Sequence, residues 1–190
     1  MARHGLPQLP MYYNSAGEYS EQIELPYISK HVLGENDVVF NPEKGKDTIK
    51  KNVFMIEEMK DWSQDRLTDH DNKDYFIQQL ADKGVDYRTF ISRHKGYIGG
   101  WKREAPKDNF MTVTSGATYT MYNEPEDDIM EVVNLAIEKL QPDFMALDFI
   151  RKDGKPMVLE ISLHPGFKAY ETKCEGGEPV NVAKAIVECF

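Results

Sequence analysis

The sequence predicts an α+β protein of two lobes, built mainly from antiparallel sheets with flanking helices. Three observations lead to this prediction. Short runs with alternating apolar residues indicate strands along much of the chain, and three segments have the spacing of amphipathic helices. Strands and helices do not alternate in the strict βαβ order of a parallel sheet. Because 190 residues slightly exceed one average domain, we expect a division into two lobes near Leu80.

The first lobe begins after an entry arm, residues 1–24, which is rich in proline and polar residues. Residues 25–80 are expected to form the smaller lobe. Within it, 25–32 and 38–40 alternate or run apolar around a turn, which predicts a hairpin. Apolar residues at spacings of four, three and three predict a helix over 46–62, and the polar segment 61–74 reads as a loop.

Residues 81–190 are expected to form the larger C-terminal lobe. Alternating or Thr- and Tyr-rich runs predict strands, and apolar stripes predict helices. The helix over 126–140 also has acidic residues in its first turn, where the helix dipole favours negative charge. From residue 75 onward, the predicted strands are 75–80, 87–92, 97–102, 110–122, 144–150 and 157–162, and the predicted helices are 126–140 and 181–189.

Composition excludes several classes of partner. Acidic residues number 32 and basic residues 23, so the net charge of -9 repels a phosphate backbone and nucleic acid is not an expected partner. No apolar run approaches the roughly 18 residues of a membrane span, and the start of the chain lacks a signal-peptide pattern. We therefore expect a cytoplasmic protein without a membrane partner. Its two cysteines, Cys174 and Cys189, are expected to be reduced thiols.

The strands on either side of Asp153-Gly154 carry the most informative residues. Asp148, Glu160 and Ser162 occupy even positions, whereas the odd positions 147, 149, 157, 159 and 161 are apolar. A three-residue loop over 152–154 keeps the polar residues on one face, with Asp148 and Glu160 about 5 to 8 Å apart. Two carboxylates and a hydroxyl suit Mg²⁺. The alternative is that these acids are simply solvated on an exposed face.

The same segment resembles the metal-binding end of ATP-grasp enzymes, especially the RimK-like ligases. An aspartate strand, Ala146-Leu147-Asp148-Phe149, is followed by Glu160 and then by Pro165-Gly166 at the family's spacing. Ser162 stands where the family usually has asparagine. The resemblance implies an ATP-grasp fold with the nucleotide in the cleft between two lobes. It also implies ATP with Mg²⁺ or Mn²⁺ as cofactors, and Asp148, Glu160 and Ser162 as metal ligands.

Upstream segments match the nucleotide side of the family in the same order. Lys30 ends a strand like the one whose lysine contacts the phosphates, although only Gly34 remains of the glycine-rich loop that usually follows. The run Gln78-Gln79-Leu80 resembles the connecting strand that binds adenine through its backbone, and Asp82 stands where a ribose-binding acid is expected. A solvated Lys30 and a turn-forming Asp82 are the alternatives.

Two further strands resemble those that point at the phosphates. Asp86-x-Arg88 and the strand ending in Lys102-Arg103 match the family's pattern, which implies Arg88 and Arg103 as catalytic donors to the transferred phosphoryl group and Lys102 as a nucleotide contact. The arginine and asparagine of the next family segment appear here as Met111 and Val113.

The resemblance implies an ATP-dependent carboxylate–amine ligase that forms an acyl phosphate on an amino acid or peptide substrate. The family usually carries another small domain ahead of the linker where this chain begins, so a partner chain supplying that domain is one expectation, and a homo-oligomer is compatible with the sequence. The alternative is a catalytically degenerate nucleotide-binding or scaffolding module that works with a partner chain. The identities of the acid and the amine stay open.

Overall fold

The computed structural model of the chain describes residues 4–13, 26–31, 36–41, 45–51, 53–57, 75–82, 84–106 and 117–189. The loop predicted at 61–74 and the residues Gly34, Met111 and Val113 lie outside these ranges. No helix in the described part of the chain is long and apolar enough to cross a bilayer. The described elements are mostly strands with a few helices, which confirms the predicted α+β class.

The chain folds into two compact units. One is formed by Pro10–Leu80, and the other by Met1–Leu9 together with Ala81–Phe190. Residues 1–24, predicted as a single entry arm, are thus shared between the units. In the larger unit Leu6 and Leu9 are buried and the Val158 amide donates to the Pro7 carbonyl at 2.8 Å, so this end of the chain is part of a folded core.

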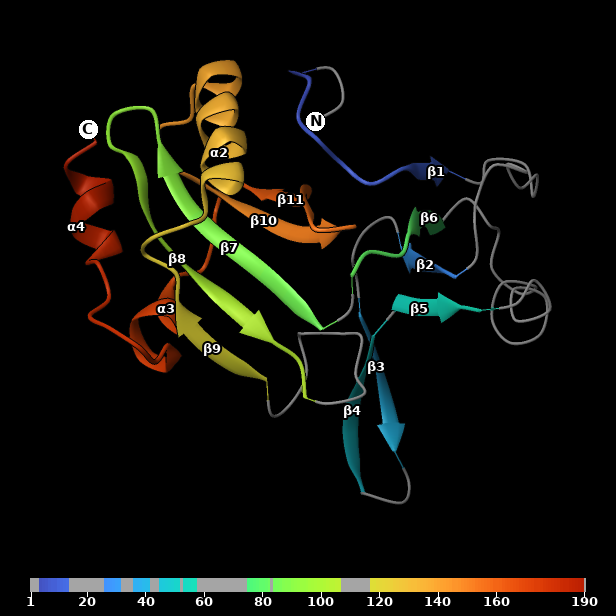
Figure 1. Cartoon of the computed structure of the whole chain (residues 1–190). Coiled ribbons are helices and arrows are strands. Elements are labelled where there is room, and N and C mark those ends of the chain that lie inside the picture. Colours follow the sequence, from blue (N-terminus) through green and yellow to red (C-terminus); the bar gives the residue numbers. More distant parts are fainter. Residues whose placement is uncertain are drawn as a thin grey trace. The chain divides into compact units, whose positions relative to one another are not determined.

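The unit Pro10–Leu80 contains a four-stranded and a two-stranded antiparallel sheet (Figure 1). The four-stranded sheet has the order β1-β6-β2-β5, and the two-stranded sheet pairs β3 with β4. The strands are β1 (Met11–Tyr13), β2 (Tyr27–His31), β3 (Asn36–Asn41), β4 (Lys46–Lys51), β5 (Val53–Ile56) and β6 (Tyr75–Gln79).

Two sequence predictions for this unit are wrong. The helix predicted over 46–62 is replaced in its described part by β4 and β5. Its helical spacing is matched by chance, and Thr48, Val53 and Phe54 are residue types that favour strands. The hairpin predicted between 25–32 and 38–40 does not form either, because β2 pairs with β5 and β6 while β3 pairs with β4. Strand patterns identify strands but do not specify their partners.

The larger unit is built on a five-stranded antiparallel sheet with the order β11-β10-β7-β8-β9. The strands predicted over 87–92, 97–102, 144–150 and 157–162 and the helices predicted over 126–140 and 181–189 are present, with ends that differ by a few residues. Of the strand predicted over 110–122, β9 is the part that lies among the described residues. An additional helix, α3, was not predicted. The elements are β7 (Val85–Ser92), β8 (Gly96–Glu104), β9 (Thr118–Met121), α2 (Asp127–Leu140), β10 (Met145–Lys152), β11 (Lys155–Ser162), α3 (Lys168–Lys173) and α4 (Val182–Val187).

Helix α2 covers one face of this sheet and forms the main core with it. Its Ile129, Val133 and Ala136 are fully buried against β7, β10 and β11, where Leu147 and Phe149 are also fully buried. Arg151, at the end of β10, fixes the start of α2 by donating to both carboxylate oxygens of Asp128 at 2.6 and 3.1 Å. This bond holds the pKa of the Asp128 carboxyl below its ordinary value.

Helices α3 and α4 cover the opposite face. Tyr170 of α3 and Val182 of α4 are fully buried against Phe90, Trp101 and Ala146 of the sheet. The Tyr170 hydroxyl donates to Asn123 at 2.9 Å and accepts from the Val180 amide at 3.0 Å. These contacts close the second core.

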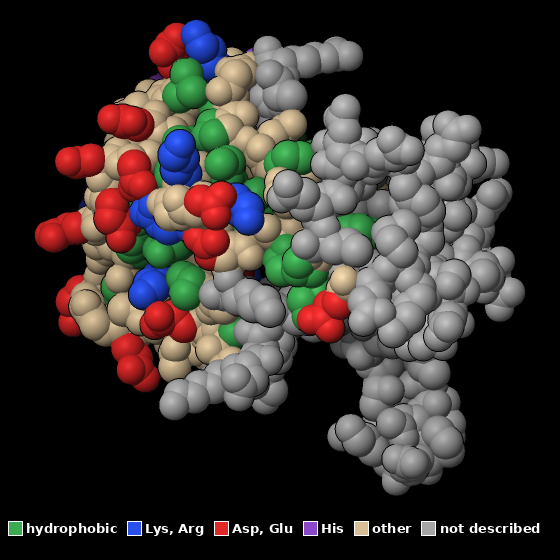
Figure 2. Space-filling model, turned by 45° about the vertical axis from the view of Figure 1, so that its right-hand side comes forward, with side chains coloured by type: hydrophobic (Ala, Val, Ile, Leu, Met, Phe, Trp, Pro, Cys, Tyr) green, Lys and Arg blue, Asp and Glu red, His purple; other side chains and the backbone are tan. Residues whose placement is uncertain are grey.

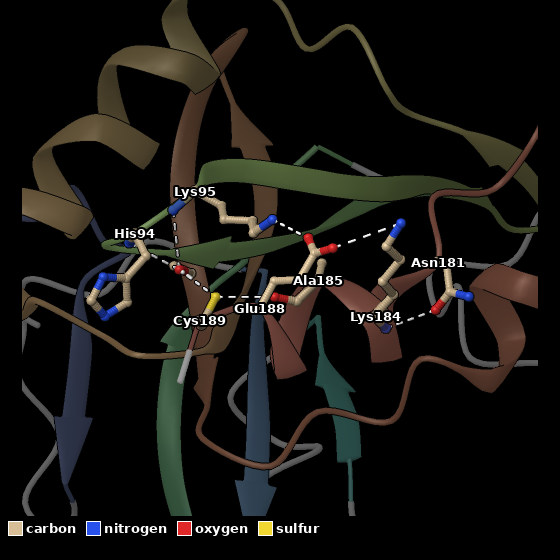
Figure 3. Close-up of polar contacts among 8 residues, drawn as sticks. His94, Lys95, Asn181, Lys184, Ala185, Glu188 and Cys189 are labelled. Carbon is tan, nitrogen blue, oxygen red and sulfur yellow. Dashed lines mark hydrogen bonds and ion pairs between the residues drawn. The ribbon is translucent and has the colours of Figure 1, made fainter.

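The end of α4 is tied to the turn between β7 and β8 by polar contacts (Figure 3). Lys95 forms an ion pair with Glu188, and Glu188 also lies 3.7 Å from Lys184. The Cys189 thiol lies 3.1 Å from the Ser92 hydroxyl, which accepts the amides of His94 and Lys95. Because Ser92 is fully buried, these amides and the thiol are the partners of a hydroxyl that water cannot reach.

Candidate functional site

The β10–β11 hairpin brings Asp148 and Glu160 directly opposite each other. They are paired across the two strands in the antiparallel register. The turn is two residues long, with Asp153 at φ 52° and Gly154 at φ 76°, the combination found in type I′ hairpin turns. Between Asp148 and Phe149 the register shifts, so Leu159 is an extra residue in β11 that forms a β-bulge.

This arrangement corrects the predicted three-residue loop. A two-residue turn alone would pair Asp148 with Leu159, and the bulge restores the pairing of Asp148 with Glu160. The apolar face also changes at the bulge. Val158, paired with Phe149, is fully buried in the core, whereas Met157 is paired with Ile150 on the other face. Alternation predicted the shared face of the two acids, but it could not distinguish an odd loop from an even loop with a bulge.

Arg88 and Asp148 form a bidentate ion pair on this face of the sheet. They are partners across β7 and β10. The Arg88 Nε and Nη2 atoms each donate to one Asp148 oxygen at 2.6 Å, and the two side chains are 21% and 13% exposed. The hydrogen bond to Asp148 raises the pKa of the Arg88 guanidinium above its ordinary value. Planar forks of this kind fix position as well as charge.

A second arginine–aspartate fork lies on the same face, one strand over. Arg103 of β8 donates through Nε and Nη2 to the two oxygens of Asp86 at 3.0 and 2.5 Å. Burial alone would lower the pKa of Arg103, but the interactions with Asp86 and Tyr119 together outweigh it and the pKa is raised. Asp86 and Arg103 are 10% and 15% exposed, so this pair is slightly more buried than the first.

Each guanidinium also lies over an aromatic ring. The Arg88 Cζ is 5.1 Å from the centre of the Trp101 ring, and the Arg103 Cζ is 5.8 Å from the centre of the Tyr119 ring. The two rings themselves meet edge to face at 6.0 Å. Aspartates on one side and aromatic rings below therefore hold two cationic side chains in fixed positions on one sheet face.

The residues on this face fit a divalent cation. Glu160 is exposed and stands opposite Asp148, and Ser162 lies two residues beyond Glu160 on the same strand face. Mg²⁺ commonly takes one or two protein carboxylates and completes its shell with water and phosphate oxygens. Within the described residues no group of three or more His, Cys, Asp or Glu side chains is placed to hold a metal. The protein oxygens that this face would offer a cation are those of the carboxylate pair and the hydroxyl.

Asp82 contacts the hairpin turn. Its two carboxylate oxygens accept the amides of Asp153 and Gly154, each at 3.2 Å, and its own amide donates to the Arg151 carbonyl at 2.7 Å. These contacts involve the turn at residues 153–154, a partner that the sequence did not predict for Asp82. Lys102 lies on the opposite face of the sheet from Arg88 and Arg103, because neighbouring residues of a strand alternate, and its Nζ pairs with Glu104 at 3.0 Å.

The remaining candidates belong to the other unit. The Lys30 Nζ donates to the side chain of Gln78 at 2.7 Å, and Gln78 is buried. The amide of Gln79 donates to the Pro10 carbonyl at 3.1 Å, and Leu80 follows the end of β6. Lys30 and Gln78 thus come together across β2 and β6.

Sequence reasoning left Asp86, Trp101 and Tyr119 out of the site. A signal for two of them exists, since Asp86 and Arg88 on β7, and Trp101 and Arg103 on β8, are spaced two apart and so share a face. Figure 2 shows acidic side chains spread around the visible surface of the described residues, with Lys and Arg among them. On that view the negative charge of the chain does not form a single patch.

Comparison with solved structures identifies ATP-grasp enzymes. The ATP-grasp ligase PsnB, complexed with a phosphomimetic variant of its minimal precursor, Mg and ADP, matches with a TM-score of 0.69 at 16% identity over 99% of this chain and 55% of that one. Macrocyclase MdnB from Microcystis aeruginosa MRC matches at 0.61, 15% identity, and 98% and 55% coverage. D-alanine–D-alanine ligase from Bacillus anthracis complexed with ATP matches at 0.57, 13% identity, and 90% and 54% coverage.

These matches show that the chain has the ATP-grasp fold. It spans little more than half the length of each of these structures. No family model matches the sequence, and no curated protein does.

Proposed function

We propose that the chain is the nucleotide- and metal-binding part of an ATP-dependent ligase of RimK-like type, which joins a carboxylate to an amine. The observation that carries the proposal is the row formed by Arg88, Asp148 and Glu160, which are cross-strand partners on one face of an ATP-grasp sheet. Because PsnB and MdnC are described with precursor peptides, we propose a peptide as the source of the carboxylate or the amine.

In the proposed reaction, an oxygen of the substrate carboxylate attacks the γ-phosphorus of ATP. The bond from that phosphorus to the bridging oxygen breaks, and ADP leaves with the bonding electrons. The amine nitrogen then attacks the acyl carbon, the bond to the phosphate oxygen breaks, and the proton of the amine passes to phosphate or solvent. No nucleophile of the protein is needed, so the side chains contribute position and charge.

Arg88 and Arg103 are the proposed donors to the phosphoryl oxygens, where fixed guanidinium groups stabilise developing negative charge. Asp148 and Glu160, with Ser162, would hold Mg²⁺ or Mn²⁺, which when bound neutralises charge on the phosphates. Asp86 keeps Arg103 in place through its two hydrogen bonds.

In the other unit, Lys30 is the proposed phosphate contact and the backbone of residues 78–80 the proposed adenine contact, both on the basis of the resemblance. Asp82 is a proposed nucleotide contact on the same basis. Lys102, which the resemblance also implied, lies on the opposite face of the sheet from Arg88 and Arg103 and is not proposed to contact the same phosphates.

The test is trapping of the acyl phosphate. Incubation with ATP, Mg²⁺ and a pool of carboxylate-bearing peptides should release ADP, and added hydroxylamine should yield the hydroxamate of the substrate. Glu160→Gln should abolish both products. Glu131→Gln is the matched control, because Glu131 is an exposed acid on α2, which covers the opposite face of the sheet. Equal ADP release by the wild type and Glu160→Gln would contradict the proposal.

A degenerate nucleotide-binding or scaffolding module is the second candidate. It is favoured by the bonds that already engage the candidate residues, namely those of Arg88 to Asp148, Lys30 to Gln78 and Asp82 to the hairpin turn. Thermal unfolding separates the two functions. A ligand at 100 times its Kd stabilises a protein by about 2.7 kcal/mol. A shift with Mg·ATP but no hydroxamate would therefore favour the module, and no shift would exclude both the ligase and a nucleotide-binding module.

A further inference from the structure

Arg88 and Asp148 satisfy each other in the absence of ligand. Both oxygens of Asp148 accept a guanidinium proton at 2.6 Å, and the pair is only partly exposed. Asp148 is also the more buried of the two carboxylates in the candidate metal site, since Glu160 opposite it is exposed. The Asp148 carboxylate therefore has two possible cationic partners. One is Arg88 of β7, and the other is an ion that Asp148 would bind jointly with Glu160 of β11.

The Arg88 guanidinium is positioned to change partners without leaving the site. It lies 5.1 Å from the centre of the buried Trp101 ring, which supports it independently of Asp148. Its side chain is 21% exposed, so part of it faces solvent. A fork released from Asp148 would thus stay beside the sheet with unpaired donors.

We propose that the Arg88–Asp148 fork is an autoinhibitory latch, in which Asp148 exchanges Arg88 for a divalent cation and the freed guanidinium becomes a phosphate donor. This inference rests on the proposed function and adds its regulation. Arg88 blocks cation binding when no nucleotide is present. By thermodynamic linkage, a cation bound to the carboxylate pair increases the affinity of Arg88 for phosphate. Bound phosphate increases the affinity of the pair for the cation by the same factor.

The first experiment measures Mn²⁺ binding without nucleotide, by the loss of the electron paramagnetic resonance signal of the free ion. Arg88→Lys keeps the positive charge but cannot form a bidentate fork. The latch predicts that this variant binds Mn²⁺ with a Kd at least about fivefold lower than the wild type, the lower end of typical coupling between sites. A general effect of charge predicts no change, because the charge is the same.

The matched control is Arg103→Lys. This substitution removes an equivalent fork from the same sheet face. Asp86, however, is not part of a carboxylate pair, because the residue paired with it across the strands is Arg103 and not a second acid. Its Mn²⁺ affinity should equal that of the wild type. An unchanged affinity in Arg88→Lys, or an equal increase in both variants, would overturn the latch.

A second measurement needs no variant for its readout. The Nε–H signal of Arg88 in nitrogen-15 NMR spectra, assigned by its absence in Arg88→Lys, should be protected from exchange in the free protein. It should lose this protection on addition of Mg²⁺ and shift again on addition of ADP. A signal that stays protected at Mg²⁺ concentrations that saturate the wild type would refute the exchange of partners.

The latch and the proposed function fail in different ways. If Mg·ATP binds and Asp148→Asn abolishes the binding, while Arg88→Lys behaves like the wild type toward Mn²⁺, the latch is wrong and the function stands. If no variant binds Mg·ATP, the function fails and the latch fails with it.

Discussion

Asp148 and Glu160 stand opposite each other but differ in what compensates their charges. Asp148 is 13% exposed and accepts two bonds from Arg88, whereas Glu160 is exposed. Replacing one partner of a partly buried ion pair leaves the other charge uncompensated, and removing an exposed carboxylate changes little. The two acids therefore contribute unequally to folding, although the proposed function uses both.

We predict that Asp148→Asn lowers the free energy of unfolding by about 1 to 3 kcal/mol, and that Glu160→Gln changes it by less than about 0.5 kcal/mol. Urea denaturation without metal or nucleotide measures both. Equal effects of the two substitutions would contradict the observed pairing.

Ser29 differs from Ser92 in the fate of its hydroxyl. Both are fully buried. The Ser29 Oγ has no hydrogen-bond partner among the described residues, whereas the Ser92 Oγ accepts two amides. We predict that Ser29→Ala leaves stability unchanged or raises it by up to about 1 kcal/mol, and that Ser92→Ala lowers it by about 1 to 3 kcal/mol. Thermal unfolding of the two variants checks this, and a clear loss of stability in Ser29→Ala would show that its hydroxyl is bonded.

At the scale of residues, the sequence predicted which acids share a face but not what neutralises them. Like charges at Asp148 and Glu160 suggest repulsion when only one hairpin is considered. The compensating Arg88 comes from β7, and no local pattern specifies that β7 pairs with β10. Trp101 and Tyr119 are missing from the predicted site for the same reason. Their rings support the two arginines of the site, and these contacts depend on the order of the strands in the sheet.

At the scale of elements, β8 depends on a close approach to β7 at Gly100. A Cβ atom at Gly100 would lie 2.2 Å from the backbone oxygen of Arg88. The strands would have to separate beside the first arginine–aspartate fork. At Gly166 a Cβ would meet nothing within 4 Å, and its φ is not in the left-handed region.

We predict that Gly100→Ala lowers the free energy of unfolding by about 3 kcal/mol or more, because the clash is with backbone rather than with a movable side chain. Gly166→Ala should be neutral or slightly stabilising, since alanine restricts the unfolded chain. Denaturant titration of both variants gives the comparison. A mild effect at Gly100 would mean that the two strands can separate at little cost.

The success of the predicted elements followed the strength of their local signals. The helix α2 has an apolar stripe and acids in its first turn, and β10 and β11 flank a strong turn sequence, so sequence and structure agree there. The segment 46–62 has apolar residues at helical spacing and also residues that favour strands, and pairing with β2 and β3 decided the outcome. Tertiary context overrides propensity where the two local signals compete.

At the scale of the whole molecule, the chain begins the larger unit, leaves it at Leu9 and returns at Ala81. The ends of the inserted unit lie close together, since the Gln79 amide donates to the Pro10 carbonyl at 3.1 Å. Residues 4–9 therefore belong to the larger unit, and Leu6, which is 3% exposed, lies in the core under α2.

We predict that Leu6→Ala destabilises the larger unit by about 2 to 5 kcal/mol, as expected for a leucine removed from a core. Hydrogen exchange measures the effect for each unit separately. Amides of β10 should lose protection, while those of β2 and β6 should keep theirs. Loss of protection restricted to the first residues of the chain would show that this segment is not part of the core.

The split of the larger unit has a consequence for synthesis on the ribosome. Residues 4–9 emerge before the inserted unit, whereas the Val158 amide that bonds to Pro7 is added only after that unit and most of the larger sheet have been made. The inserted unit emerges complete in between and contains its own sheet partners. Leu6 and Leu9 are therefore apolar and uncovered until the residues of β11 have been synthesised. A nascent chain with these features is a natural client for chaperones that bind short apolar segments near the ribosomal exit.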